Sequence, residues 1–94
     1  MPQAMMKMDE GPARPDRDGL LRMFRETATE VVEKDFHHVV EGSVISELAI
    51  DSLGMLEIIG SLERRLRVQI PDESLTGLQT IRDLLDVVEK RFED

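Results

Sequence analysis

The first third of the chain contains one segment in which apolar residues recur with the period of an α-helix. It follows Asp18, which suits an N-cap, and charged residues occupy the opposite face. This pattern predicts a helix over residues 18–34. Its apolar stripe consists of Leu20, Leu21, Phe24, Thr27, Ala28, Val31 and Val32.

The next segment, from Asp35 to Asp51, does not continue this period and contains Gly42. Apolar residues are nevertheless frequent enough in it to pack over a core, so we expect a long ordered loop. The apolar residues in question are Val39, Val44, Ile45 and Leu48.

The second half of the chain predicts three more helices. Residues 52–67 have the widest apolar face, Pro71 opens a short helix that ends near residue 77, and Thr80 is an N-cap with Asp83 three residues later. No strand alternation and no repeat competes with these helices. The predicted fold is therefore all-α: a small four-helix bundle with three main helices, one short helix and a long loop between the first and second helices.

The charge of the chain restricts its partners. Twelve Lys and Arg against 20 Asp and Glu give a net charge of −8 over 94 residues. Residues 1–17 hold three of the four prolines, and their charges cancel, so we expect a flexible tail over residues 1–17 and an acidic domain over residues 18–94. A pI of about 4.7 and only three aromatic residues exclude nucleic acid as a partner. An acidic surface instead attracts proteins with basic patches.

The chain also lacks the residues on which several compartments and site types depend. It has no cysteine, so disulfides and thiolate metal sites are excluded. It has no signal-peptide pattern and no run of 18 apolar residues. We therefore expect a cytoplasmic protein that does not span a membrane.

No combination of residues predicts an active site. The histidines, His37 and His38, are neighbours in the expected loop, where a solvated surface position is the ordinary outcome, and no nucleophile or zinc motif accompanies them. The acidic pair Asp72 and Glu73 opens a helix, where negative charge complements the helix dipole. We therefore predict neither catalytic residues nor a metal site.

The start of the second predicted helix is more unusual. Asp51 or Ser52 could simply cap this helix, a role that contributes about 1 kcal/mol. On a helical wheel, however, the face opposite the core carries two leucines and a glycine in addition to charges, which favours a surface that a partner approaches. The residues of this predicted partner-binding face are Leu53, Leu56, Glu57, Gly60 and Arg64. A non-catalytic helical interaction module, with Ser52 as a helix cap, is the alternative that this pattern leaves open.

From Val44 to Val88 the sequence resembles the acyl carrier proteins of fatty acid and polyketide synthesis. The resemblance centres on Asp51-Ser52-Leu53, which is similar to the Asp-Ser-Leu motif of that family. It implies that Ser52 carries a covalent 4′-phosphopantetheine arm derived from coenzyme A, with Asp51 and Leu53 beside it. The flanking matches are Leu48, Leu56-Glu57-Ile58-Ile59, Leu62-Glu63, Ile70-Pro71-Asp72-Glu73 and Thr80-Ile81.

The same resemblance implies a function and a set of partners. The chain would be a discrete, monomeric carrier that holds acyl groups as thioesters, not an enzyme. Its partners would be a phosphopantetheinyl transferase and synthase enzymes such as a ketosynthase and an acyltransferase. The acyl chain would enter between apolar helix faces, for which the candidate lining residues are Met55, Ile59, Leu62, Leu78 and Leu85.

The sequence departs from the fatty acid members at two places. Gly54 follows the motif where those members usually have an aspartate, and Arg64 and Arg65 stand where acidic residues are common. These differences favour polyketide or another specialised synthesis over general fatty acid synthesis.

Overall fold

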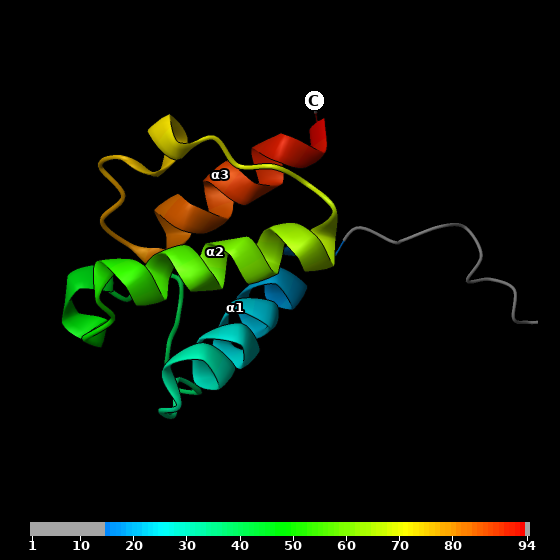
Figure 1. Ribbon diagram of the computed structural model, residues 1–94. Helices are drawn as coiled ribbons and strands as arrows, with labels where there is room; N and C mark the ends of the chain where they lie inside the picture. The colour runs from blue at the N-terminus through cyan, green and yellow to red at the C-terminus, as the bar shows by residue number, and fades with distance from the viewer. Residues whose placement is uncertain (1–14, 94) are drawn as a thin grey trace, which may run out of the picture.

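The computed structural model describes residues 15–93, in which α2 crosses between α1 on one side and α3 on the other (Figure 1). Within these residues no strand forms, and Val44 and Thr80 make an isolated antiparallel bridge. The all-α fold is therefore confirmed. The elements are α1 (Arg17–Val32), the 3₁₀ turn η2 (Ile45–Leu48), α2 (Ser52–Leu66), the 3₁₀ turn η3 (Asp72–Leu75) and α3 (Ile81–Glu93).

The short helix predicted over residues 71–77 is only partly formed. It is the single 3₁₀ turn η3, which begins after Pro71 and is followed by Gly77 in a left-handed conformation, at φ 82°. A segment this short forms too few hydrogen bonds to offset the cost of starting an α-helix, and 3₁₀ geometry is the usual result.

The expected N-cap of the first helix is wrong. Asp16, not Asp18, caps α1, because its Oδ1 accepts a hydrogen bond from Gly19 N–H at 2.8 Å. Asp18 lies in the first turn, where its charge is also favourable, so the sequence pattern suits either residue. Residues 1–14 of the expected tail lie outside the described residues.

Arg17, at the start of α1, joins three parts of the fold. Its guanidinium lies 3.1 Å from Glu41 in the loop and 2.6 Å and 2.8 Å from Asp86 and Glu89 on α3. Partial burial opposes its ionisation, but the hydrogen bonds to Glu41 and Asp86 outweigh that effect and raise the pKa of Arg17 above its ordinary value. This cluster anchors α1 to the loop and to α3.

The loop between α1 and α2 packs over the core, as its apolar residues predict. Phe36 and Val39 are buried, and Arg25 Nε donates to the Val39 carbonyl at 2.8 Å. Backbone hydrogen bonds then tie the loop to the start of α3: Ile45 N–H to Gln79 O at 2.9 Å, Ile81 N–H to Ser43 O at 3.0 Å and Arg82 N–H to Glu41 O at 2.8 Å.

The start of α3 has the predicted cap. Asp83 N–H donates to Thr80 Oγ1 at 3.2 Å, and Asp83 Oδ2 accepts from Gln79 N–H at 3.0 Å and Thr80 N–H at 3.1 Å. These backbone hydrogen bonds hold the pKa of Asp83 below its usual value. The core beneath consists of Leu20, Phe24, Ala28, Phe36, Val39, Ile58, Ile59, Leu62, Ile70, Ile81, Leu84, Leu85 and Val88.

Candidate functional site

Asp51 alone caps α2. Its Oδ1 accepts a hydrogen bond from Gly54 N–H at 2.7 Å, and its carbonyl accepts one from Met55 N–H at 2.9 Å. Ser52 is the first residue of the helix and is exposed, and within residues 15–93 its hydroxyl makes no hydrogen bond. Ser52 as a helix cap is therefore wrong, because the neighbouring aspartate fills that role. The hydroxyl remains accessible for chemistry.

Gly54 allows the close contacts that shape this helix start. A Cβ at this position would lie 3.1 Å from Asp51 Oδ1 and 3.2 Å from Ile50 Cγ2, so both neighbours would have to shift by a few tenths of an ångström. The glycine that departs from the fatty acid pattern thus lets the cap carboxylate and Ile50 pack tightly beside Ser52.

An apolar pocket of ≈ 310 Å³ opens beside Ser52, between α2 and the two 3₁₀ turns. Three of the predicted lining residues, Met55, Ile59 and Leu78, are among those that line it. The other two, Leu62 and Leu85, do not border this pocket and are buried in the core at 2% and 1% exposure, so their contact with an acyl chain stays a prediction. The complete lining is Ile45, Ser52, Met55, Leu56, Ile59, Leu75 and Leu78.

The comparisons with known proteins agree with this geometry. A family described as "Phosphopantetheine attachment site" matches residues 24–88, most of the described chain. The chain belongs to the acyl carrier protein family. Members of this family are carriers rather than enzymes, and their prosthetic group is covalently bound 4′-phosphopantetheine.

Individual relatives share about two fifths of their aligned residues with the chain. It is 43% identical over 54 residues to the meromycolate extension acyl carrier protein of Mycobacterium leprae. The aligned segment covers 57% of this chain and 47% of the relative. It is 41% identical over 51 residues to the acyl carrier protein of Rhodococcus erythropolis, covering 54% and 56%. The chain thus spans about half the length of the curated relatives it matches.

A crystal structure of an acyl carrier protein from Thermotoga maritima has the same fold. The two superpose with a TM-score of 0.75 at 31% sequence identity, covering 82% of this chain and 91% of that one.

The features around Ser52 fit the prosthetic group of the family. Ser52 is exposed and its hydroxyl makes no hydrogen bond within residues 15–93, so an incoming phosphate can reach this oxygen. The N-terminus of α2 also favours an anion at this position, because its free amides and dipole attract negative charge.

The predicted partner-binding face is exposed, but it has two sides. Leu53 and Leu56 are 65% and 56% exposed, and Glu57 and Arg64 are exposed too. Leu53 and Glu57 border a groove of ≈ 280 Å³ toward α1, whereas Leu56 borders the apolar pocket. Gly60 is half-buried, with Arg64 Nη1 3.6 Å from the place of a Cβ. Partner binding at this face stays a prediction.

The histidines lie in the exposed loop, as expected. His37 Nδ1 is 2.5 Å from Asp35 Oδ1, and hydrogen bonds from the His37 backbone and ring lower the pKa of Asp35. The ring of His38 stacks on Phe36 at 6.4 Å between centroids. Over the described part of the chain, no group of three or more His, Asp or Glu residues could hold a metal ion, and no helix could cross a membrane.

Three pocket residues were missed by sequence reasoning. Ile45 and Leu75 lie in 3₁₀ turns, which have no helical period, and Leu56 was assigned only to the outer face of its helix. The available signal was their apolar character next to the Asp-Ser-Leu motif, but nothing in the sequence showed which turns would approach Ser52.

Proposed function

We propose that this chain is an acyl carrier protein whose phosphopantetheine arm is attached to Ser52. The observation that carries the proposal is the exposed Ser52 hydroxyl at the first residue of α2, capped by its neighbour and bordering an apolar pocket. When bound, the arm supplies a terminal thiol on which acyl groups travel as thioesters. The chain itself has no cysteine, so no protein thiol competes for the acyl group.

The residues around Ser52 have separate tasks in this proposal. Asp51 holds the first turn of α2 through Gly54 N–H, so the attachment point is rigid. The N-terminus of α2 favours the phosphodiester charge. The pocket shelters the first part of an acyl chain from water, because its lining is almost entirely apolar.

The partners we propose are a phosphopantetheinyl transferase and the ketosynthase, acyltransferase and related enzymes of one pathway, all in the cytoplasm. Leu53, Leu56 and Glu57 would meet them, because these side chains are exposed around Ser52. Polyketide or another specialised synthesis is the pathway we favour. Arg64 supports this choice, since an exposed cation on α2 repels enzymes whose basic patches expect a carboxylate there.

Intact mass tests the attachment site. The apo protein is incubated with coenzyme A, Mg²⁺ and a broad-range phosphopantetheinyl transferase, and a gain of one phosphopantetheinyl group is expected. Ser52→Ala should gain no mass and should stay folded, because the cap hydrogen bond belongs to Asp51. Ser46, which is also exposed, provides the control Ser46→Ala, which should be modified normally. A mass gain in Ser52→Ala would contradict the assignment, and no gain in the natural chain would favour the interaction module.

A further inference from the structure

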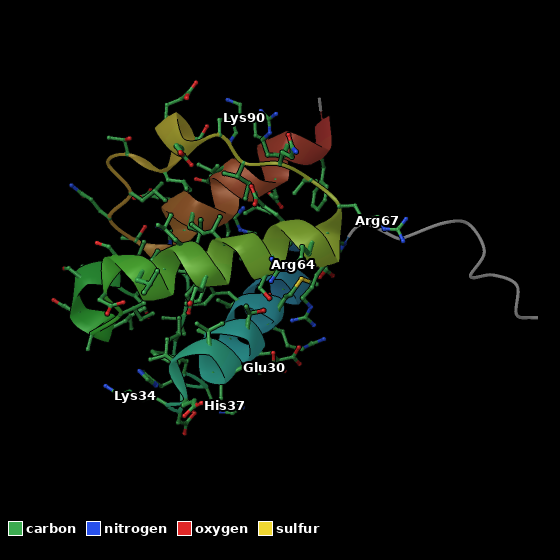
Figure 2. The ribbon with its side chains drawn as sticks, viewed as in Figure 1. Glu30, Lys34, His37, Arg64, Arg67 and Lys90 are labelled. Atoms are coloured by element: carbon green, nitrogen blue, oxygen red, sulfur yellow. The ribbon has the colours of Figure 1, made fainter. Side chains whose placement is uncertain are left out.

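The C-terminal end of α2 is basic, in contrast to the acidic chain as a whole. It carries Arg64, Arg65 and Arg67 within four consecutive positions. Arg65 is engaged, because Nη1 donates to Thr27 Oγ1 at 2.9 Å and Nη2 lies 3.5 Å from Glu26 Oε1. Arg64 and Arg67 are exposed, and within residues 15–93 neither guanidinium forms an ion pair. Figure 2 labels both side chains at this end of α2.

Within residues 15–93 Arg22 is likewise exposed and without an ion pair, but the other arginines are engaged. Arg17 contacts three carboxylates, Arg82 lies 3.7 Å from Glu41, and Arg25 donates to a backbone carbonyl. Arg64 and Arg67 instead line a shallow pocket of ≈ 440 Å³ together with Glu63, Val68 and Gln69. The Glu63 carboxylate accepts a hydrogen bond from Ile70 N–H at 2.7 Å, so it is already engaged by the backbone.

Cations near a helix C-terminus also stabilise the helix dipole, and this role accounts for part of the pattern. Arg64 and Arg65 both lie in the last turn of α2, and Arg67 is its C-cap residue. The dipole effect is local and needs no partner. It predicts a change in stability on substitution, but no change in binding, and the two roles can therefore be separated.

The two arginines lie at a defined distance from Ser52. Twelve and fifteen residues along a helix correspond to about 18 and 22 Å at 1.5 Å per residue. The other end of α2 is negative, with Asp51 and Glu57 both exposed. An interface of ordinary size covers about 800 Å² on each partner, or a disc about 30 Å across. A disc of this size centred on Ser52 reaches only about 15 Å, so an enzyme contacts the basic end where its interface extends from Ser52 along α2.

We propose that Arg64 and Arg67 form a second docking site, which binds a carboxylate-bearing surface on the enzymes that act at Ser52. This inference rests on the proposed function and adds the chemistry of the partner. The matching enzyme has a basic patch at its active-site entrance and an acidic patch about 20 Å away, the distance given by the helical rise. Opposite charges at the two ends of α2 fix the orientation of the carrier, because a reversed complex would bring like charges together.

An acidic peptide can test the basic end directly. The probe is N-acetyl-decaglutamate, titrated into ¹⁵N-labelled holo protein at low salt and followed by NMR. Amide shifts are expected around residues 64–69, and Arg64→Gln/Arg67→Gln should weaken binding at least fivefold. Arg22→Gln/Lys90→Gln removes two exposed cations elsewhere and should bind within twofold of the natural chain. Arg64→Lys/Arg67→Lys keeps the charge and should retain binding even if the neutral variant is unstable.

Other outcomes would overturn the proposal. Equal weakening in both neutral variants would show a response to net charge alone, and shifts centred elsewhere would place the contact on another surface. Binding to vesicles of phosphatidylcholine and phosphatidylglycerol, without binding to the peptide, would indicate a lipid partner. Self-association lost in Arg64→Gln/Arg67→Gln would indicate a second copy of this chain.

Intact mass separates this inference from the proposed function. If Ser52 gains the arm but the peptide does not bind at residues 64–69, only the second docking site is refuted. If the natural chain gains no arm, the carrier function itself fails, whatever the peptide does.

Discussion

Loading Ser52 with straight acyl chains of increasing length should raise the melting temperature in steps. The chain would enter the apolar pocket of ≈ 310 Å³ that Ser52 borders in the folded state, and it would be exposed after unfolding. Burial of a methylene contributes about 0.8 kcal/mol, so the six methylenes of an octanoyl chain contribute about 5 kcal/mol. Loss of rotational freedom offsets about 2 kcal/mol of this, as for a long side chain.

The net effect of an octanoyl chain is therefore about 3 kcal/mol, which corresponds to roughly 12–24 °C in a domain of this size. The gain should level off once the pocket is full. The pocket of ≈ 310 Å³ is partly open to solvent, so the end of a longer chain remains outside it. Acetyl, butanoyl, hexanoyl, octanoyl, decanoyl and dodecanoyl forms, prepared with the corresponding acyl-coenzyme A, are compared by circular dichroism.

Leu78→Phe provides the decisive variant, since a larger side chain in the pocket lining should reduce the gain from octanoyl by at least half. Leu53→Phe is the matched control, because Leu53 is 65% exposed and is not part of that lining. The melting temperature of each octanoyl variant is compared with that of the acetyl form of the same variant, so that any effect of the substitution on the unloaded fold cancels. A melting temperature independent of chain length, or an equal octanoyl gain in both variants, would refute burial of the chain in this pocket.

Changes of surface charge provide further tests. Glu57→Gln should slow modification of Ser52 by the transferase without unfolding the domain. Added salt should slow modification of the natural chain, because charges beyond about 8 Å are screened at physiological ionic strength. Modification rates independent of salt would argue against electrostatic docking. Arg64→Glu with Gly60→Met should increase turnover of the loaded carrier by a general fatty acid ketosynthase, and equal, efficient turnover of both forms would remove the basis for specialisation. Arg17→Gln should lower the free energy of unfolding by about 1–2 kcal/mol in urea melts, since partly exposed ion pairs contribute up to about 1 kcal/mol each; a loss unchanged in 1 M salt would contradict the ionic origin.

The helices themselves could be predicted from the sequence because their signals are local. The apolar period of α2 and the Thr80 and Asp83 cap of α3 depend on residues within a few positions of one another. The start of α1 was harder, since Asp16 and Asp18 suit the same local pattern and only the hydrogen bond to Gly19 distinguishes them.

The pocket could be predicted only in part, because it depends on contacts between distant segments. Met55 and Leu62 are both apolar residues of α2, yet one borders the pocket and the other is buried in the core. The difference arises from where η2 and η3 come to lie, which no period in those turns encodes. The Arg17 cluster has the same origin, since its three carboxylates are 24 to 72 positions away.

The separation of tasks between Asp51 and Ser52 has a consequence for how a partner could distinguish the forms of this protein. Only the Asp51 side chain contributes to the cap, through Gly54 N–H, so attachment of a group to Ser52 breaks no hydrogen bond within residues 15–93. The first turn of α2 is then expected to have the same conformation before and after modification. An enzyme that must tell the modified carrier from the unmodified one obtains no signal from the backbone of this turn and has to contact the arm itself.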